Sequence, residues 1–571
     1  MTEPSYVHGH SDAPLLGETI GRRFDATATA HPDAEAIVSR HQGLRYTYGE
    51  LRREVDVVAR GLMAFGVEKG DRVGIWSPNN VEWMVVQYAT AKIGAILVNI
   101  NPAYRTHELE YAIRQSGVSV LISARGFRQT DYLGMLHEVV PELGAGRSGR
   151  VASRALPDLE RLVLLGEGGG DGDTRSHGAV SWDEVRAGAE EVSDERLGER
   201  EASLDFDDPI NIQYTSGTTG FPKGATLSHH NILNNGYFIG ERMRLASEDR
   251  ICLPVPFYHC FGMVLGNLAA MTHASAIVLP GEAFDPSACL EAVEAERCTA
   301  LYGVPTMFIA ELELPGFDRY RLDSLRTGIM AGSPCPVEVM RKVIDRMHMD
   351  EVTICYGMTE TSPVSFQSNV DDDLEVRVAT VGEVHPHVEV KIVDTEGHVV
   401  SRGETGELCT RGYNVMLGYW SNEDATREAI DAARWMHTGD LAMMREDGFA
   451  NIVGRIKDMI IRGGENVYPR EIEEFLYGHP KVADVQVIGV PDSKYGEEIC
   501  AWVKLKEAEL ATDEEIRDWC RGKIATFKIP RYVLFVDEFP MTVTGKVQKF
   551  VMRDRTVEEL GLGEAAAVRT A

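Results

Sequence analysis

Hydrophobic and polar positions between residues 20 and 130 alternate in a way that predicts strands and helices in turn. Thr47 and Glu50 have the spacing of a capping box, in which each side chain accepts a hydrogen bond from the backbone at a helix start. Behind them, one apolar face recurs at helical spacings and is formed by Leu51, Val55, Val58, Leu62 and Phe65. The pattern predicts an amphipathic helix that follows Thr47.

A βαβ unit is predicted next along the chain. Residues 72–76 form a short apolar run, Asn79 and Asn80 can cap a helix that extends to about residue 93, and residues 95–99 form a second apolar run. Strands that are joined by a crossover helix pair in parallel, and helices usually cover both faces of a parallel sheet. We therefore expect layered α/β sheets in this part of the chain.

Two changes of pattern interrupt the α/β alternation. Residues 144–194 are rich in Gly and small polar residues, with one strand-like run at 162–165. We expect this segment to form a surface insertion with mobile loops. The α/β pattern resumes from residue 209 to about 451 and changes again near Lys457.

The C-terminal residues predict a small separate domain. The elements expected there are helices that begin at Pro469 and at about 513–523, and strands at 482–490, 499–506 and 531–536. The fold class is therefore expected to be α/β. A large N-terminal domain of layered α/β sheets (residues 1–456) would precede a small, mobile α+β C-terminal domain (residues 457–571), with a hinge at Lys457.

Length and charge narrow the class of protein. A chain of 571 residues is too long for one ordinary core. It has 58 Lys+Arg and 88 Asp+Glu residues, a net charge of −30, which argues against a nucleic-acid partner and against a polybasic membrane anchor. No apolar run approaches the ~20 residues that a spanning helix needs. We expect a cytoplasmic protein without a transmembrane segment.

Cysteine usage and the N-terminus support this expectation. All nine cysteines lie from Cys252 onward and none forms a CxxC pair, so neither a disulfide scaffold nor a structural zinc site is expected, and a reducing compartment fits. The first residues have no apolar segment typical of a secretory signal. His8 and His10 are interpreted as part of a frayed terminus, with a metal-binding tract as the alternative.

The strongest chemical signal is the run TSGTTGFPKG at residues 215–224. Glycines let backbone amides approach an anion closely, hydroxyl groups add donors, and Lys223 adds a positive charge. The spacing departs from the Walker A motif, because Pro222 and Lys223 stand where that motif has Gly-Lys. With a strand-like run before it and a predicted helix at 228–237, the run predicts a phosphate-binding loop of another kind. Its members are Thr215, Ser216, Gly217, Thr218, Thr219, Gly220, Phe221, Pro222 and Lys223.

Five motifs in the same order resemble the adenylate-forming superfamily, which comprises acyl-CoA synthetases, firefly-type luciferases and the adenylation domains of peptide synthetases. They are the loop above, YGMTE at 356–360, TGD at 438–440, GRIKDMIIRGGENVYPREIE from Gly454, and TGK at 544–546. Long runs such as NIQYTSGTTG, RGYNVMLGYW and FKIPRYVLFV are most similar to medium-chain fatty acyl-CoA synthetases. The resemblance covers the chain except for about the first fifteen residues and residues 144–194.

This resemblance implies how the chain would hold ATP. The loop would bind the pyrophosphate portion, Thr359 would contact the α-phosphate, and Glu360 would hold Mg²⁺, a cation that prefers oxygen ligands. Asp440 would accept both ribose hydroxyls, since a carboxylate is acceptor-only, and Arg455 would pair beside it with the ribose or phosphate. The implied walls of the adenine site are Gly332, Ser333, Tyr356 and Gly357. A buried core position remains the alternative for Tyr356.

The resemblance also assigns roles to the C-terminal domain. Lys546 would be the catalytic lysine of adenylation, where a cation can bridge the acyl carboxylate and the α-phosphate as negative charge builds. Rotation about Lys457 would then replace Lys546 with the loop at Gly463 and Gly464, which admits the pantetheine arm of CoA. Relatives often have Asp at the hinge, and Lys is a common alternative. The neighbouring Lys549 is expected to be a solvated surface residue.

An aromatic segment, PFYHCFG at 256–262, contains His259. In the family the matching element borders the acyl pocket, so His259 is expected to act there as a gate or positioning residue. A hydrogen-bonded core histidine is the alternative. The candidate residues for binding the acyl substrate are Tyr258, His259, Val304, Thr306 and Ser362.

Taken together, the resemblance implies an acid–thiol ligase that uses ATP, Mg²⁺, CoA and a small-molecule carboxylic acid. It would form an acyl adenylate with release of pyrophosphate, then an acyl-CoA with release of AMP. A medium-chain fatty acid is the expected acid, and an aromatic acid is the next choice. A fatty acyl-AMP ligase that loads a carrier protein, a luciferase-like oxygenation and a non-catalytic acyl or nucleotide sensor remain as alternatives. Oligomeric state stays open, with a homodimer among the alternatives.

Overall fold

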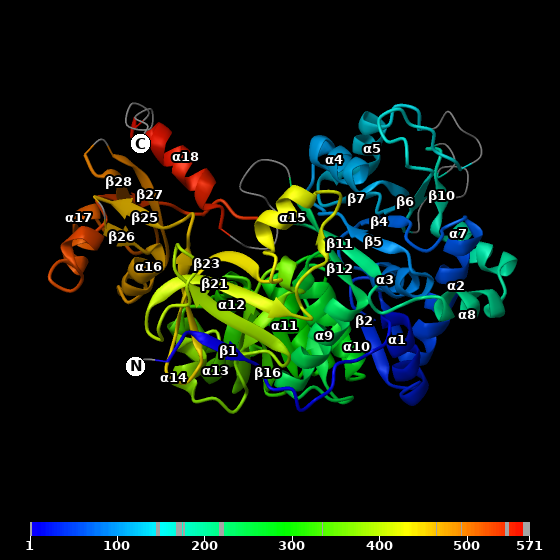
Figure 1. Ribbon diagram of the computed structural model, residues 1–571, viewed down its shortest axis with the longest axis horizontal. Coiled ribbons are helices and arrows are strands. Elements are labelled where there is room, and N and C mark those ends of the chain that lie inside the picture. The colour runs from blue at the N-terminus through cyan, green and yellow to red at the C-terminus, as the bar shows by residue number, and fades with distance from the viewer. Residues whose placement is uncertain are drawn as a thin grey trace.

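The computed structural model describes residues 3–143, 149–166, 174, 177–215, 222–333, 335–463, 465–492, 494–542 and 547–562. Four large sheets, called A to D, organise these residues (Figure 1). Sheets A, B and C, with their helices, form the large N-terminal part. Sheet D and the C-terminal helices lie apart from it, at the upper left of Figure 1. The predicted α/β fold class is confirmed.

Sheet A has eight strands and contains the predicted βαβ unit. That unit consists of β4 (Arg72–Trp76), α3 (Val81–Ile93) and β5 (Ile96–Asn99), with β4 and β5 parallel. The Asn80 side chain caps α3 by accepting the N–H of Trp83 at 2.8 Å. The other strands are β6 (Val118–Ser123), β9 (Arg161–Leu164), β10 (Val180–Ser181), β11 (Pro209–Thr215), β12 (Lys223–Ser228) and β22 (Gly418–Tyr419).

Sheet B has nine strands, most of them parallel. Its strand β17 (Glu351–Gly357) ends in the first two residues of the YGMTE run, so this motif begins at the carboxyl end of a sheet strand. The others, in sheet order, are β19 (Glu383–Val384), β18 (Val364–Gln367), β16 (Thr327–Ala331), β15 (Ala300–Gly303), β13 (Arg250–Cys252), β14 (Ala276–Leu279), β2 (Glu35–Ser39) and β3 (Leu44–Thr47).

Helices packed between sheets A and B form the largest core. The buried cluster includes residues of both sheets and of α1 (Ile20–Ala30), α2 (Tyr48–Ala64), α3, α9 (His229–Met243) and the π-helix η2 (Phe261–Leu268). The predicted capping box at Thr47 and Glu50 is present at the start of α2. Along α2, the predicted apolar face is buried at Leu51, Val55, Val58 and Leu62, whereas Phe65 is only partly buried.

Sheet C is antiparallel and completes the large N-terminal part, whereas sheet D forms the centre of the C-terminal unit. Sheet C consists of β1 (Tyr6–His8), β20 (Val388–Val393), β21 (Thr405–Gly412), β23 (Met436–Met444) and β24 (Ala450–Arg455). Sheet D consists of β25 (Ile460–Arg462), β26 (Glu465–Val467), β27 (Val482–Asp492), β28 (Gly496–Leu505) and β29 (Tyr532–Phe535). The helices of the C-terminal unit are α16 (Pro469–Tyr477), α17 (Asp513–Cys520) and α18 (Lys549–Glu559).

The predicted C-terminal elements agree with the structure to within a few residues, and Pro469 occupies the first turn of α16 as expected. Two apolar clusters, which contain residues of the C-terminal unit only, pack on sheet D. The boundary between residues 456 and 457 remains a prediction. Lys549 contradicts its expected role as a solvated residue: its ammonium pairs with the buried Glu473 carboxylate at 2.6 Å and donates to the Val487 carbonyl at 3.0 Å.

Within the segment 144–194, the strand expected at 162–165 is present as β9 (Arg161–Leu164), but the described elements are part of the fold rather than a surface insertion. Strand β9 lies inside sheet A between β6 and β10, and Leu162 and Val163 are buried there. Helix α7 (Trp182–Gly188) packs against α2. Strands β9 and β10 thus extend sheet A beyond β6, whose edge would otherwise be exposed. Residues 144–148 and 167–170 lie outside the described residues.

The frayed N-terminus is also corrected. Strand β1 pairs antiparallel with β20, so His8 belongs to sheet C, and the Tyr6 hydroxyl donates to Glu389 at 2.8 Å. His10 lies 3.4 Å from the Glu383 carboxylate. The edge of β20 supplies the backbone hydrogen-bond partners of β1, because a strand of three residues is not stable alone.

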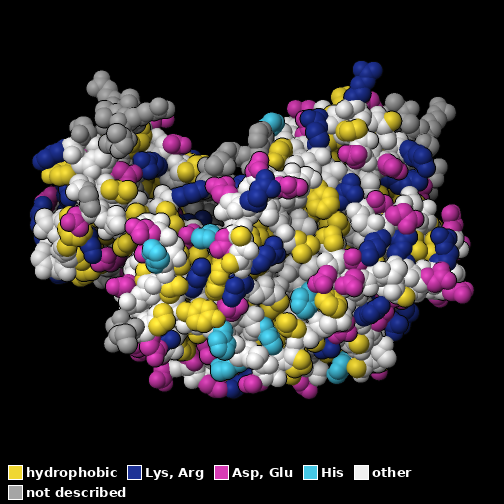
Figure 2. Space-filling view, in the orientation of Figure 1, with side chains coloured by type: hydrophobic (Ala, Val, Ile, Leu, Met, Phe, Trp, Pro, Cys, Tyr) yellow, Lys and Arg dark blue, Asp and Glu magenta, His cyan; other side chains and the backbone are white. Residues whose placement is uncertain are grey.

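The surface carries both signs of charge. Figure 2 shows Asp and Glu side chains interspersed with Lys and Arg over the visible face. The chain as a whole has more acidic than basic residues. No helix in the described part of the chain combines the length and apolar character needed to cross a bilayer. All nine cysteines are buried and carry free thiols.

One buried carboxyl group makes stability depend on pH. Glu311 of α12 (Pro305–Leu312) is 1% exposed, and burial raises its pKa to about 8. The folded chain therefore keeps a proton that the unfolded chain releases above about pH 4.5, so rising pH favours unfolding up to about pH 8.

We predict that Glu311→Gln removes this dependence. Between about pH 5 and pH 8 the wild-type chain should lose stability relative to the variant, by roughly 1.4 kcal/mol per pH unit at most. Denaturant midpoints measured at several pH values give the comparison. Glu313→Gln, at an exposed position just after the same helix, is the control and should keep the wild-type slope. Parallel slopes for all three proteins would contradict the assignment.

Candidate active site

Glu360 joins sheets A and B through its carboxylate. It lies in the short helix η4 (Thr359–Thr361), which follows β17, and is 5% exposed. Its Oε1 atom accepts a hydrogen bond from the Thr215 hydroxyl at 3.2 Å and another from the Tyr419 hydroxyl at 2.8 Å. Both bonds end on one oxygen, and no donor among the described residues contacts Oε2. Burial and the Glu360 charge raise the pKa of Tyr419, so Tyr419 stays a donor.

Asp440 joins sheets B and C in the same way. It lies on β23 and is 6% exposed. The Tyr356 hydroxyl, at the end of β17, donates to Oδ2 at 2.7 Å, and Arg455 Nε donates to Oδ1 at 3.1 Å. Burial, followed by the Asp440 charge, raises the pKa of Tyr356. Desolvation would lower the pKa of Arg455, but the acidic neighbours Asp440 and Asp458, together with Tyr356, outweigh it and the pKa rises.

The carboxyl end of β17 therefore stands where three sheets meet. Within five residues of chain it supplies Tyr356 to Asp440 and Glu360 to Thr215. Ligand sites in α/β folds lie at the carboxyl ends of strands, because loops leave the sheet there and backbone dipoles point outward. The structure thus brings together Thr215, Tyr356, Glu360, Asp440 and Arg455 from four distant segments.

Gly357 makes this junction sterically feasible. A Cβ atom on Gly357 would lie 1.7 Å from the carbonyl oxygen of Pro363, which accepts the N–H of Met358 at 2.9 Å. Only glycine fits at such a distance. The turn between β17 and β18 can therefore fold tightly enough to place Thr359 and Glu360 beside sheet A.

The phosphate-loop candidate connects two paired strands. Thr215 of β11 and Lys223 of β12 are register partners, and the Lys223 ammonium lies 5.1 Å from the centre of the Tyr419 ring. The helix predicted at 228–237 is present as α9, with Ser228 as its N-cap, whereas the strand β12 between the loop and this helix was not predicted. After the half-buried Lys223, the residues of β12 are buried on both faces of sheet A. The Gly and Pro residues in this part of the sequence concealed the strand. The loop residues Ser216, Gly217, Thr218, Thr219, Gly220 and Phe221 lie outside the described residues, and Pro222 adjoins them.

His259 is half-buried and belongs to the turn that precedes η2. Its Nδ1 atom accepts the backbone N–H of Phe261 at 3.1 Å, and its ring meets that of Tyr258 edge-on at 6.5 Å. The adjacent Cys260 thiol is buried, which raises its pKa, and a hydrogen bond with Thr359 opposes that rise. The His259 segment and the Glu360 segment therefore touch through Cys260 and Thr359.

The other predicted pocket residues lie at the ends of neighbouring strands of sheet B. Gly332 follows β16 with a φ of +92°, and a Cβ atom there would lie 3.1 Å from Val304 Cγ1. Val304 is buried at the start of α12, and Thr306 and Ser333 are partly exposed. Ser362 is fully buried after η4. These positions are consistent with a pocket wall, and their roles remain predictions.

The C-terminal candidates fall only partly within the described residues. Lys457 occupies an exposed turn between β24 of sheet C and β25 of sheet D. The Gly463 N–H donates to the Tyr495 carbonyl at 2.8 Å, within sheet D. Gly464 and Lys546 lie outside the described residues. The residues that flank Lys546 are close to each other, because Met541 and Val547 form an antiparallel bridge.

Sequence reasoning missed two supporting residues. Tyr419 lies within the run RGYNVMLGYW, which carried the family resemblance but no individual role. Glu407 holds the turn before Asp440: its Oε1 atom accepts the N–H of Gly439 at 3.1 Å. A Glu at this position looks like an ordinary polar residue on an antiparallel strand, so only the structure identifies it.

Comparison with known proteins decides the family. The family model for the AMP-binding enzyme matches residues 24–420, and that for the AMP-binding enzyme C-terminal domain matches residues 471–546. The chain belongs to the AMP-binding enzyme family. The resemblance to adenylate-forming enzymes is therefore confirmed.

Relatives of known name match over nearly the whole chain. YngI of Bacillus subtilis (strain 168) is 51% identical over 554 residues, which are 97% of this chain and 100% of YngI. The mitochondrial medium-chain acyl-CoA ligase ACSF2 of Bos taurus is 47% identical, covering 98% of this chain and 91% of that protein. Among solved structures, the anthranilate CoA ligase AuaEII in complex with anthranoyl-AMP has a TM-score of 0.82 at 26% identity, covering 96% and 99%.

We predict that the β17 junction tolerates no side chain at position 357. Gly357→Ala should lower stability by roughly 1–3 kcal/mol or more, because backbone must move to relieve the contact with Pro363. Gly454→Ala is the matched control, since a Cβ atom there would meet nothing within 4 Å. Thermal and denaturant midpoints report both effects. Equal midpoints for the two variants would show that the turn has room for a side chain.

Proposed function

We propose that the protein is an ATP-dependent acyl-CoA ligase that works through an acyl adenylate. The observation that carries the proposal is a pair of buried carboxylates beside the end of β17: Glu360, which follows this strand, and Asp440 of β23, which accepts a hydrogen bond from its residue Tyr356. Glu360 is hydrogen-bonded to Thr215, the first residue of the phosphate-loop candidate, and Asp440 is held by Tyr356 and Arg455. A nucleotide that spans these two carboxylates would have its phosphates beside Glu360 and its ribose beside Asp440.

Joining a carboxylate to a thiol requires a better leaving group than the carboxylate oxygen. Attack of that oxygen on the α-phosphorus of ATP forms an acyl adenylate and releases pyrophosphate. Attack of the CoA thiolate on the acyl carbon then forms the thioester and releases AMP. A site for both steps must hold the phosphates, neutralise charge that builds on the α-phosphoryl group and exclude water.

The described residues fit the nucleotide part of this task. Asp440 accepts hydrogen bonds only, and Tyr356 and Arg455 hold it in place, so its two oxygens suit two ribose hydroxyls. Thr359 and the loop 215–223 would contact the α-phosphate and the pyrophosphate. Gly332, Ser333 and Gly357 would border adenine beside Tyr356. These assignments are our proposal.

Magnesium suits the other carboxylate. Glu360 is buried and negatively charged, and Thr215 and Tyr419 orient it while donating to one oxygen only. Oxygen donors of this kind are the ligands that Mg²⁺ prefers. Bound there, Mg²⁺ would neutralise phosphate charge. Glu360, Thr215 and Lys223 would then fix the position of the pyrophosphate.

The C-terminal unit would supply the groups that change between the two steps. We assign adenylation to Lys546, with Lys457 as the hinge between a large domain (1–456) and a small domain (457–571). The support is the position of Lys457 between the last strand of sheet C and the first strand of sheet D, and the separate core of sheet D. After rotation, the loop with Gly463 and Gly464 would line the path of CoA.

A medium-chain fatty acid is the proposed acid. The support is the name of the ACSF2 relative, which aligns over nearly the whole chain. The His259 turn, with Tyr258, Val304, Thr306 and Ser362, would line the acyl pocket. An aromatic acid is the second candidate, since the AuaEII neighbour is named for anthranilate. A cytoplasmic location and a homodimer remain predictions, the former consistent with nine buried free thiols.

We predict that a panel of carboxylic acids separates these alternatives. Pyrophosphate release should require acid and ATP, and should be fastest for saturated acids of medium chain length. Addition of CoA should yield the matching thioester and AMP. Benzoate and coumarate test the aromatic alternative. Pyrophosphate release without any CoA thioester would favour a carrier-loading ligase, and no release with any acid would reject the proposed function.

We also predict that two lysine variants separate the half-reactions in opposite directions. Lys546→Ala should slow acyl-adenylate formation by roughly 10²–10³-fold, as loss of a transition-state donor does, yet still convert supplied acyl-AMP and CoA into the thioester. Lys457→Pro should leave adenylation nearly intact and cripple thioester formation, because a proline removes backbone freedom at the hinge.

Lys342→Ala is the control, because Lys342 is an exposed lysine on α13 (Val337–Met347). Single-turnover assays of each half-reaction give the comparison. Full adenylation by Lys546→Ala would remove that residue from its role. Equal loss of both half-reactions in Lys457→Pro would contradict a hinge that acts between the two steps.

A further inference from the structure

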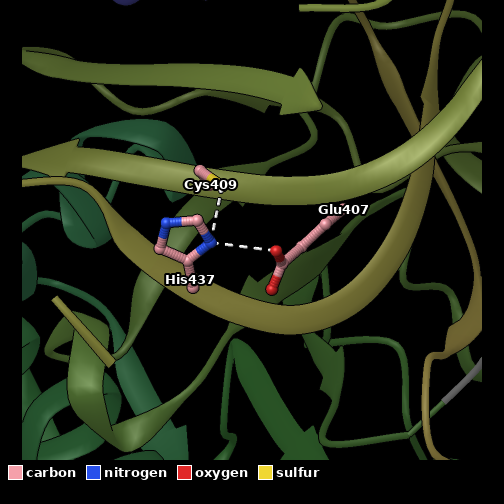
Figure 3. Close-up of side chains that lie close together, drawn as sticks. All are labelled: Glu407, Cys409 and His437. Carbon is pink, nitrogen blue, oxygen red and sulfur yellow. Dashed lines mark hydrogen bonds and ion pairs between the residues drawn. The ribbon is translucent and has the colours of Figure 1, made fainter. Parts of the chain in front are cut away.

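Three side chains with metal-binding atoms lie together on sheet C, a short distance from the proposed ribose site. Cys409 and Glu407 come from β21, and His437 comes from β23, where it is the register partner of Cys409. Figure 3 shows the three side chains converging on the imidazole. The His437 Nδ1 atom lies 3.5 Å from Cys409 Sγ and 2.9 Å from Glu407 Oε2, and the three ligand atoms are all within 4.8 Å of one another.

We propose that Glu407, Cys409 and His437 form a binding site for a borderline-soft divalent transition ion of the Zn²⁺ class, with a fourth position open to solvent. Because Glu407 also holds the turn before Asp440, ion binding is coupled to nucleotide binding.

The ligand distances match a tetrahedral ion. With Zn–S of ~2.3 Å and Zn–N or Zn–O of ~2.05 Å, tetrahedral angles place S and N about 3.5 Å apart and N and O about 3.3 Å apart. The Sγ–Nδ1 distance of 3.5 Å already fits. The Nδ1–Oε2 distance of 2.9 Å must lengthen by a few tenths of an ångström, which a side-chain rotation can supply. Cys409 and His437 are paired across the two strands, and the three ligand atoms lie within 4.8 Å of one another.

The residues around the three ligands also suit an ion. The second ring nitrogen of His437 lies 3.9 Å from the Asp431 carboxylate, and metal-bound histidines usually donate that N–H to such a group. His437 and Glu407 are 33% and 22% exposed, whereas Cys409 is buried, so an ion would enter from the imidazole side. Thiolate and imidazole ligands select Zn²⁺ or Co²⁺ over Mg²⁺.

Ion binding requires a balanced movement of protons. In the metal-free site His437 Nδ1 donates to Glu407, because a carboxylate can only accept. On ion binding, Nδ1 gives up this proton and Nε2 takes one from solvent, so the imidazole stays neutral and Nε2–H faces Asp431. Cys409 loses its thiol proton to solvent and becomes a thiolate. One proton is released for each ion bound.

Glu407 links this cluster to the proposed ribose site, so the coupling rests on the proposed function. Its Oε2 atom faces His437, while Oε1 accepts the N–H of Gly439, the residue before Asp440. The Asp440 N–H in turn donates to the Thr438 hydroxyl at 3.1 Å. An ion that draws Glu407 toward Cys409 weakens the Gly439 contact and changes the position of the Asp440 carboxylate.

Cobalt spectroscopy tests the site without nucleotide or activity. Co²⁺ titrated into the metal-free full-length protein should give a near-ultraviolet thiolate-to-cobalt band with one ion per chain, and Zn²⁺ should displace it. Cys409→Ser should abolish the band, and His437→Gln should weaken Co²⁺ affinity by at least about tenfold. His398→Ala is the matched control: His398 also lies near two carboxylates, Asp394 and Glu396, but is 73% exposed and has no thiol beside it.

An unchanged band in Cys409→Ser, or no band in the wild-type protein, would overturn the site. The coupling has its own test, in which AMP is titrated with and without saturating Zn²⁺. The AMP affinity should fall by about fivefold or more in the wild-type protein and stay constant in Cys409→Ser. A band without such a shift would overturn the coupling. Failure of AMP to bind at all would instead contradict the proposed function and leave the cobalt result unaffected.

Discussion

Two buried carboxylates, Glu360 and Asp440, connect sheets A, B and C where strand β17 ends. Glu360 accepts hydrogen bonds from Thr215 and Tyr419 of sheet A, and Asp440 of sheet C accepts one from Tyr356 of sheet B. A buried carboxylate without donors would cost several kcal/mol, so each one specifies where its partners must lie. The residues that form this junction of sheets are also the ones proposed to hold the nucleotide, so the junction and the candidate active site are one structure.

This arrangement explains why the chemistry is divided between two parts of the chain. Sheets A, B and C fix the groups that would hold a nucleotide, and the buried apolar clusters on these sheets leave the groups little freedom to move. The groups proposed to change between steps belong to the unit built on sheet D, which has its own core and follows the turn at Lys457. In this proposal the large part of the chain holds the nucleotide rigidly, and the unit built on sheet D exchanges the reacting groups between the two steps.

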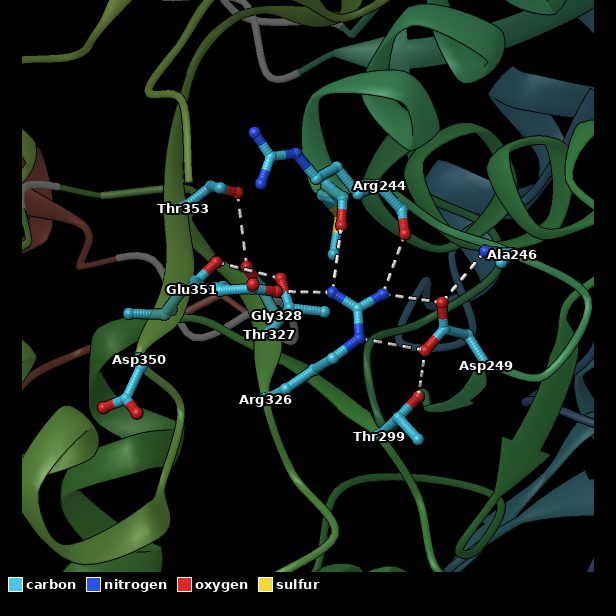
Figure 4. Close-up of polar contacts among 12 residues, drawn as sticks. Arg244, Ala246, Asp249, Thr299, Arg326, Thr327, Gly328, Asp350, Glu351 and Thr353 are labelled. Atoms are coloured by element: carbon cyan, nitrogen blue, oxygen red, sulfur yellow. Dashed lines mark hydrogen bonds and ion pairs between the residues drawn. The ribbon is translucent and has the colours of Figure 1, made fainter. Parts of the chain in front are cut away.

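Local patterns in the sequence predicted the local structure well. The capping box, the βαβ unit and the helix at Pro469 each depend on residues close in the chain, and the five motifs identified most site candidates. Contacts between distant segments were not predictable. Tyr419 on Glu360 is one case, and the Arg326 cluster is another: Arg326 donates to Asp249 at 2.6 Å and to Glu351 at 2.5 Å, from three separate segments (Figure 4). No spacing rule connects such residues, because sheet order alone makes them neighbours.

The most direct measurement is a crystal structure of the full chain with a hydrolysis-resistant acyl-adenylate analogue. The ribose hydroxyls should lie within hydrogen-bonding distance of Asp440, and the phosphate should lie between Thr215 and Thr359, close to Glu360. The adenine should rest against the end of β17. An analogue bound elsewhere, with both carboxylates still engaged only by protein donors, would contradict the central claim that this junction of sheets is the nucleotide site.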